Sequence, residues 1–254
     1  MTDFLNNGGV AGAHNLRDLG GMKAGAGRIR DGRLIRSGEL TSLEAAGSAR
    51  LEGFGLGCIV DFRSAVERDV SPTSSALLAA VPHWHMTPNE SLGDPAPILS
   101  RCLISVETSR SVVHGLYRHM PFAHHLAIRA LIEAILEGKP VLFHCAAGKD
   151  RTGVAAALLL TLVGVERKAI RTDYALSEKS VEATIARFLL KPGSHVLLDT
   201  PSEIWRPLMA SDPEYLDTMF EEIERLHGSV QRYAQEVLGF GSDITNRLQK
   251  VLLT

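Results

Sequence analysis

Ten residues near the middle of the chain, 144–153, have the types and the spacing to bind and cleave a phosphate monoester. Cys145 is followed by Arg151 six positions later, and His144 and Thr152 flank this pair. A phosphate monoester is a dianion near neutral pH, so a site that cleaves it must hold negative charge and direct a nucleophile at phosphorus. We expect the thiolate of Cys145 to be the nucleophile and the guanidinium fork of Arg151 to bind two phosphate oxygens. The Thr152 hydroxyl is expected to donate a hydrogen bond to the thiolate and favour its ionised form.

Small residues follow the cysteine. Ala146, Ala147 and Gly148 would let the backbone amides approach an anion and form a nest around its oxygens. The loop follows a predicted strand over residues 140–144 and precedes a predicted apolar helix over 152–163, so a helix N-terminus also faces the anion. A cysteine at such a helix N-terminus ionises more readily than a free one.

The elements that must position this loop alternate between strand-like and helix-like segments. The segment from Gly27 to Arg36 is expected to form a small hairpin around a turn at Arg30–Arg33, and Thr41 with Glu44 has the spacing of a capping box. The alternation predicts an α/β fold with a central, mostly parallel sheet flanked by helices. The expected strands are 58–63, 81–86 and 140–144, and the expected helices are 42–52, a segment from Pro121 to Gly138, and 152–163.

The last third of the chain is predicted to be helical. Residues 166–177 and 178–190 form two amphipathic segments, and Lys191–Gly193 breaks the second one. Helix starts are expected at Thr200 and Asp212, each of which precedes a proline. No linker or internal repeat divides the chain, so residues 1–254 are expected to form a single domain with a helical C-terminal part over 200–254.

The loop and three earlier motifs resemble the cysteine-dependent protein tyrosine phosphatase superfamily. The loop is similar to the HCxxGKDRTG sequence of a bacterial tyrosine phosphatase group whose members also accept phosphoserine, phosphothreonine and phosphoinositides. Residues 15–21, 32–38 and 60–64 look like the N-terminal signatures of that group, in the same order. The resemblance extends from residue 14 to about 177. It implies the cysteine-phosphatase fold and hydrolysis through a phosphocysteine intermediate, without a metal or cofactor.

The resemblance also implies roles for single residues of the loop. Cys145 would be the nucleophile and Arg151 the phosphate clamp, while Lys149 and Asp150 would reach towards the substrate. Members of this group are thought to protonate the leaving oxygen with the loop aspartate, so Asp150 is the expected general acid. Lys149 in this position resembles the members of the superfamily that cleave inositol phosphates, and it would add a point charge at the mouth of the site.

Other candidates for the general acid are less well supported. The superfamily's usual acid lies on a Trp-Pro-Asp loop, and the nearest segment here, Asp94–Pro95, lacks the tryptophan. Asp61 is a second candidate, although Asp61 with Arg63 is also typical of a strand-end ion pair that orders a site. Arg17 and Asp18 likewise allow either a direct catalytic role or a structural ion pair.

Several residues near the loop have plain structural explanations as well. His144 is expected to hold the loop through hydrogen bonds rather than to titrate. Cys58 is expected in the core, with a reversible disulfide to Cys145 as the alternative. The helical pair over 166–193 is either a lid over the site or ordinary core.

Charge and composition limit the other function classes. The formal net charge of the 254 residues is -2, which gives no general attraction to nucleic acid. Cys58, Cys102 and Cys145 cannot all pair within one chain, so a reducing compartment is expected. The longest apolar stretch, Val154–Val165, is too short to span a bilayer. No secretory signal is recognised, and a cytoplasmic protein is expected, with export by a route without a cleaved signal left open.

The substrate class and two rival functions remain open at this stage. A phosphorylated protein is expected ahead of a phosphoinositide, and the sequence does not define an oligomeric state. The histidines at 83, 85, 124 and 125 lack a complete metal-ligand set, so no metal is expected. The alternatives to an active phosphatase are a catalytically idle phosphate-binding module and a rhodanese-like sulfurtransferase.

Overall fold

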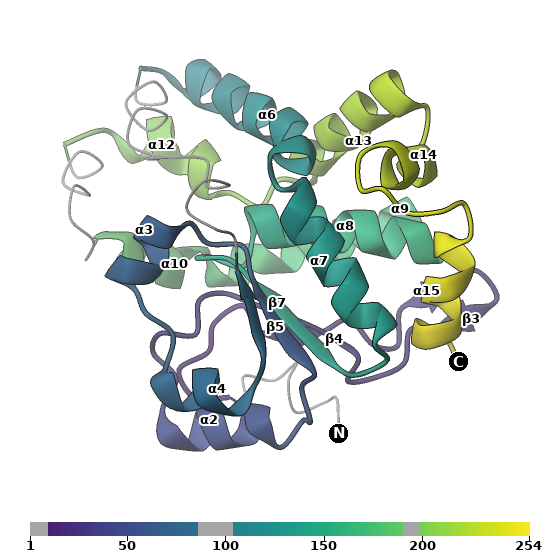
Figure 1. The fold of residues 1–254 in the computed structure, drawn as a ribbon. Coiled ribbons are helices and arrows are strands. Elements are labelled where there is room, and N and C mark those ends of the chain that lie inside the picture. Colours follow the sequence, from purple (N-terminus) through teal and green to yellow (C-terminus); the bar gives the residue numbers. More distant parts are fainter. Residues whose placement is uncertain (1–9, 86–103, 190–198) are drawn as a thin grey trace.

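The computed structural model describes residues 10–85, 104–189 and 199–254. A five-stranded sheet lies at its centre, with helices on both sides (Figure 1). Four of the strands run parallel and the edge strand β1 is antiparallel to its neighbour. The α/β fold with a mostly parallel sheet is therefore confirmed. In spatial order the strands are β1 (Arg17–Asp18), β4 (Leu34–Ser37), β7 (Val141–His144), β5 (Cys58–Asp61) and β6 (His83–His85).

Strand register brings the chemistry to one edge of the sheet. The last residue of β7, His144, is paired with Ser37 on β4 and with Asp61 on β5. The carboxyl ends of these three parallel strands therefore lie side by side, and the segment with Cys145 begins there. This edge is where ligands bind in open parallel sheets.

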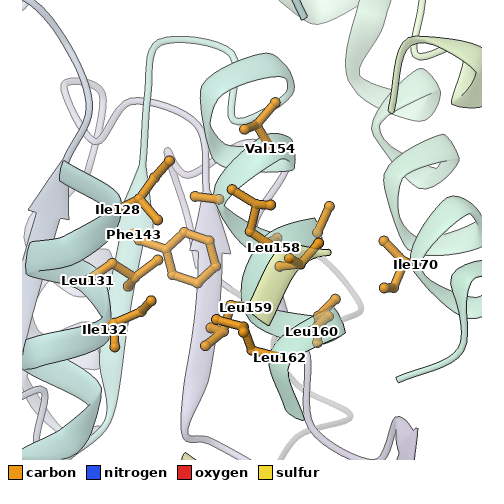
Figure 2. Close-up of a cluster of buried hydrophobic side chains, with 14 of the residues drawn as sticks. Ile128, Leu131, Ile132, Phe143, Val154, Leu158, Leu159, Leu160, Leu162 and Ile170 are labelled. Atoms are coloured by element: carbon orange, nitrogen blue, oxygen red, sulfur yellow. The ribbon is translucent and has the colours of Figure 1, made fainter. Parts of the chain in front are cut away.

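Strand β7 is buried on both faces, and alternate residues enter different cores. Val141 and Phe143 belong to the larger hydrophobic cluster, and Leu142 belongs to the smaller one. In Figure 2, Phe143 lies between Leu131 from one helix and Leu158 from another. The central strand is therefore fixed by apolar packing on each side, and so is the start of the loop.

Helices cover the two faces unequally. The larger cluster lies under α7 (His125–Leu136) and α8 (Asp150–Val163), and α8 is buried nearly all round. The smaller cluster lies under α2 (Ala45–Glu52) and α4 (Ser75–Ala80), whose Leu51 and Leu77 meet Leu142 of the sheet. The remaining helices are α3 (Ala65–Val70), α6 (Val106–Ala123), α9 (Arg167–Ala175), the 3-10 helix η2 (Leu176–Ser180), α10 (Val181–Leu189), α12 (Ser202–Met209), α13 (Pro213–His227), α14 (Val230–Glu236) and α15 (Ile244–Leu252).

The predicted strands and the C-terminal helices are largely confirmed. The strand expected over 140–144 is β7, and those expected over 58–63 and 81–86 are β5 and β6. Asp212 caps α13 by accepting a hydrogen bond from the Glu214 amide, with Pro213 in the first turn. No described helix combines the length and the apolar composition needed to cross a bilayer.

The predicted hairpin over residues 27–36 is wrong. Strand β3 (Gly27–Arg28) pairs with β2 (Lys23–Ala24) in a separate two-stranded sheet, while β4 joins the main sheet beside β7. All four residues of β4 are buried, so an interior position suits it better than a surface hairpin. The turn at Gly32 is instead held by its amide, which donates to the Asp18 carboxylate at 2.6 Å.

Two predicted helix starts are also wrong. Helix α2 begins after Glu44 and without a side-chain cap, and the Thr41 hydroxyl donates to the Ser71 carbonyl. Pro121 lies in the last turn of α6 rather than at the start of α7, and its carbonyl accepts a hydrogen bond from Tyr233. Asp94–Pro95, Cys102 and the break at Lys191–Gly193 lie outside the described residues.

Candidate active site

The segment between β7 and α8 forms a tight loop with the cysteine at its base. Cys145 is a free thiol and is only 2% exposed. Gly148 has a φ of +67°, and a Cβ at this position would lie 2.3 Å from the Ser37 carbonyl oxygen. Only glycine fits this position, because other residues disfavour the conformation and would collide with β4. We call residues 145–151 the phosphate loop.

The carbonyl groups of the phosphate loop are held from outside by residues of the first two motifs, 15–21 and 32–38, and by the next residue, Glu39. Asn15 donates to the carbonyls of Ala147 and Gly148, at 3.0 and 2.9 Å. Arg36 also donates to Gly148, at 2.9 Å, and the Glu39 amide donates to Ala146 at 2.9 Å.

The amides of the loop are used differently. Those of residues 146–149 donate no hydrogen bond to any described residue. Helix α8 also begins without a side-chain cap. The loop therefore has the donors of an anion site, a set of unused amides next to a helix N-terminus.

A buried ion cluster stands behind the loop. Asp173 on α9 accepts from Arg17 at 2.7 Å and from Arg36 at 2.5 Å. Burial would raise the pKa of Asp173, but the two arginines outweigh burial and lower it. Burial and the charge of Arg36 lower the pKa of Arg17 to about 10, so Arg17 stays charged at neutral pH. This cluster fixes Arg36, and Arg36 fixes the Gly148 carbonyl.

Arg17 and Asp18 thus have structural contacts in the molecule. Arg17 belongs to the cluster, and the Asp18 carboxylate accepts from the amides of Gly20 and Gly32. Burial raises the pKa of Asp18.

Arg151 is oriented by a carboxylate that the sequence analysis missed. Glu67 on α3 accepts from Arg151 Nη1 at 2.7 Å and from Nη2 at 2.6 Å. Nη1 also donates to the Phe62 carbonyl at 3.1 Å. Among the described residues these are the hydrogen bonds of the guanidinium, so Nε and the second proton of Nη2 remain on one edge. That edge is a fork that suits two phosphate oxygens.

The pKa shifts of this pair show how strongly it is coupled. Burial would raise the pKa of Glu67, but the charge and hydrogen bonds of Arg151 lower it to about 2. Burial would lower the pKa of Arg151, and Glu67 outweighs that effect and raises it. The spacing Ser64-x-x-Glu67 could have revealed Glu67, because the two residues form a capping box at the start of α3.

Asp150 is the first residue of α8, and its side chain is 30% exposed. Its Oδ1 accepts a hydrogen bond from the Tyr117 hydroxyl at 2.6 Å and lies 3.3 Å from Lys149 Nζ. Asp150 belongs to the phosphate loop and its side chain is partly exposed, whereas Asp61, the second candidate for the general acid, is buried.

Lys149 has a different position from the one expected at the mouth of the site. It is only 5% exposed, and its ammonium donates to the carbonyls of Leu208 and Ala210, at 2.8 and 3.0 Å. These carbonyls belong to the C-terminal end of α12, so in this structure Lys149 connects the phosphate loop to that helix.

Asp61, Arg63 and His144 form a buried group beside the loop. Arg63 Nη2 lies 2.8 Å from Asp61 Oδ2, and the Arg63 side chain also donates to Ser71 and Thr73. Burial would raise the pKa of Asp61, but His144 and Arg63 outweigh it and lower it. Burial lowers the pKa of His144, whose Nδ1 lies 3.1 Å from the Cys145 carbonyl. This arrangement is the strand-end ion pair.

One expected contact of Cys145 and one alternative contact are absent from the structure. The Thr152 hydroxyl is fully buried and bonds to no described residue, so the expected hydrogen bond to the thiolate is not formed. Cys58 is paired with Val141, at the opposite end of β7 from Cys145. Strand rise separates the two thiols by far more than a disulfide allows, so that alternative is wrong.

Of the helical pair predicted over 166–193, the described part up to Leu189 packs partly as core. Ile170 and Val181 are buried, while Ile185 and Leu189 are half-buried. The Tyr174 ring packs against α8, where a Cβ at Gly153 would lie 2.8 Å from it. In the described ranges no three His, Cys, Asp or Glu side chains gather as a metal-ligand set.

Comparison with known proteins identifies the family. A model described as the tyrosine phosphatase family matches residues 9–254. The chain belongs to the tyrosine phosphatase family. The resemblance noted in the sequence is thereby confirmed, and so is the class of enzyme, a hydrolase of the protein tyrosine phosphatase type.

Two relatives within the tyrosine phosphatase family match over most of their length, and a third matches over about half. The chain is 30% identical over 276 residues to the triple specificity protein phosphatase PtpB of Mycobacterium tuberculosis. This match covers 96% of this chain and 98% of that protein. It is 34% identical over 228 residues to a protein of Cupriavidus necator whose name places it among the tyrosine-protein phosphatases, covering 88% and 81%. A tyrosine-protein phosphatase of Nostoc commune is 33% identical over 150 residues, covering 58% and 49%.

Proposed function

We propose that this phosphatase cleaves phosphate monoesters through a covalent phosphocysteine at Cys145. The observation that supports the proposal most is the phosphate loop, whose carbonyls are held from outside while the amides of residues 146–149 bond to no described residue. Three oxygens of a phosphate dianion would accept from these amides and from the open edge of Arg151.

The reaction has two steps in this proposal. The Cys145 thiolate attacks phosphorus, the bond from phosphorus to the ester oxygen breaks, and Asp150 gives that oxygen its proton. Asp150 then takes a proton from water, whose oxygen attacks the phosphocysteine. The sulfur leaves as a thiolate and inorganic phosphate is released, so proton and thiolate are both regenerated.

The proposed role of Arg151 is to stabilise the transition state. Charge spreads over the equatorial phosphate oxygens as the bond to the ester oxygen breaks. A guanidinium that Glu67 already holds in place needs no reorganisation at that moment, which increases its benefit.

The proposed substrates are phosphorylated proteins. The name of PtpB in Mycobacterium tuberculosis states triple specificity, which supports phosphoserine and phosphothreonine beside phosphotyrosine, and phosphoinositides are a further class. The net charge of -2 favours soluble phosphoproteins over an anionic membrane surface. We further propose one domain over residues 1–254 and work in the reducing cytoplasm, where a thiolate is protected from oxidation.

The test is a set of variants assayed on 4-nitrophenyl phosphate and on phenyl phosphate. Cys145→Ser should abolish turnover, and rapid quenching of the native enzyme should trap one phosphate per chain on Cys145. Asp150→Asn should slow the phenyl ester, which has the poorer leaving group, far more than the nitrophenyl ester. Full activity of Cys145→Ser would refute the proposal.

The alternatives have their own outcomes in the same experiment. Tight phosphopeptide binding without a burst of leaving group would favour an idle binding module. Sulfur transfer from thiosulfate would favour a rhodanese-like enzyme. Loss of wild-type activity in EDTA would show that the metal-independent mechanism is wrong.

A further inference from the structure

A chain of two buried tyrosines leads to Asp150. The Tyr117 hydroxyl from α6 donates to Asp150 Oδ1 at 2.6 Å, and the Tyr174 hydroxyl from α9 lies 2.5 Å from that of Tyr117. Both tyrosines are at most 1% exposed. Side chains from the three helices α6, α8 and α9 are therefore connected in one hydrogen-bonded chain that ends at a carboxylate oxygen.

The direction of the protons in this chain follows from counting them. Each hydroxyl carries one proton, and Tyr117 gives its proton to Asp150, so Tyr174 must donate to Tyr117. Burial and the nearby charge of Asp150 raise the pKa of Tyr117 well above its usual value. Burial likewise raises the pKa of Tyr174. Both hydroxyls are therefore protonated donors throughout the working pH range of an enzyme.

Two donors converge on the same oxygen of Asp150. Besides Tyr117, the Lys149 ammonium lies 3.3 Å from Oδ1. A carboxylic proton on Oδ1 would point at a donor, so the proton of the acid belongs on Oδ2. A hydrogen bond at one oxygen also fixes the rotation of the carboxyl group, which sets where the other oxygen lies.

We propose that Tyr117 is the positioning residue of the general acid, holding Oδ1 of Asp150 so that Oδ2 carries the proton to the leaving oxygen. Tyr174 holds Tyr117 in turn. This inference rests on the proposed role of Asp150 as the acid. It also explains the glycine at position 153, because a side chain there would displace the Tyr174 ring.

The experiment compares Tyr117→Phe with Tyr233→Phe on the two aryl phosphates. Tyr233 is a matched control, since its buried hydroxyl donates to the Pro121 carbonyl at 2.6 Å, in the core. With Tyr117→Phe we expect kcat/KM to fall about tenfold on phenyl phosphate and less than about twofold on 4-nitrophenyl phosphate, the value of one hydrogen bond. Tyr233→Phe should leave the ratio of the two values unchanged.

A double variant separates this inference from the proposed function. In an Asp150→Asn background, Tyr117→Phe should add no further selectivity between the esters. Additional selectivity there, or an equal loss on both esters from Tyr117→Phe alone, would overturn the positioning role while Asp150 remained the acid. If Asp150→Asn itself shows no selectivity, the acid assignment fails and the positioning role fails with it.

Discussion

Replacing Glu67 with glutamine should weaken the folded state at neutral pH. Arg151 outweighs burial and lowers the pKa of Glu67 from 4.5 to about 2. A carboxyl group whose pKa is lower in the folded chain stabilises that state above the unfolded pKa, and the effect is lost as pH falls through the folded value. The difference between the unfolded and folded pKa values corresponds to about 3 kcal/mol of unfolding free energy at pH 7. Because the Glu67 side chain is 23% exposed, solvent screening reduces this to about 2 kcal/mol.

The assay is denaturant unfolding of the native chain and Glu67→Gln between pH 7 and pH 3. The difference in unfolding free energy should be about 2 kcal/mol from pH 7 to pH 5 and should shrink below about pH 4.5, because only the native chain has the titrating carboxyl. Glu133→Gln is the control. Glu133 pairs with Arg129 on the surface at 2.9 Å, so its loss should cost less than about 0.5 kcal/mol at any pH.

Activity gives an independent reading of the same change. In Glu67→Gln the amide keeps only one acceptor oxygen, so the guanidinium of Arg151 loses its opposing charge and at least one of its three hydrogen bonds. We expect kcat/KM on 4-nitrophenyl phosphate to fall by about 10- to 100-fold. A pH-independent difference in stability, or an unchanged kcat/KM, would refute the reasoning. A rise in activity would mean that Glu67 competes with the phosphate for Arg151.

Three further predictions concern the support of the phosphate loop. Gly148→Ala should cost about 3 kcal/mol or more and abolish activity, since its Cβ would meet the Ser37 carbonyl at 2.3 Å; calorimetry and turnover both check this. Asp173→Asn should cost about 3 to 5 kcal/mol in denaturant unfolding, because it leaves two buried arginines without their carboxylate; a loss below 1 kcal/mol would contradict it. Lys149→Met should make α12 exchange its amide hydrogens faster, because the carbonyls of Leu208 and Ala210 lose their donor, and unchanged exchange would count against the link.

Local patterns predicted the parts of the site that are continuous in sequence. The spacing from Cys145 to Arg151 and the apolar residues around it were sufficient to place a strand, a loop and a helix. Strand β7 was recognisable because its residues form a nearly continuous apolar run. Such a run is usual for a strand of a parallel sheet, which is buried on both faces. The hairpin failed for a related reason, since pairing of β4 with a distant strand outweighed a local turn.

Contacts across long sequence distances were not predictable in this way. Nothing in the spacing of Tyr117 or Tyr174 indicates that both lie against Asp150, because they come from separate helices. The burial of Lys149 depends on where α12 lies, which is a tertiary property. The position of Glu67 at a helix start was predictable, because its capping-box pattern is local. Its hydrogen bond to Arg151 was not, because the two residues are 84 positions apart.

The hydrogen bonds from Asn15 to the phosphate loop have a consequence for how the enzyme comes into existence. Asn15 and Ala147 are 132 positions apart, so the chain must close a very long segment before this contact forms. During synthesis the first motif leaves the ribosome long before the loop that it supports. A nascent chain that has not yet closed this segment therefore has the cysteine but not the hydrogen bonds that hold the carbonyls of the phosphate loop.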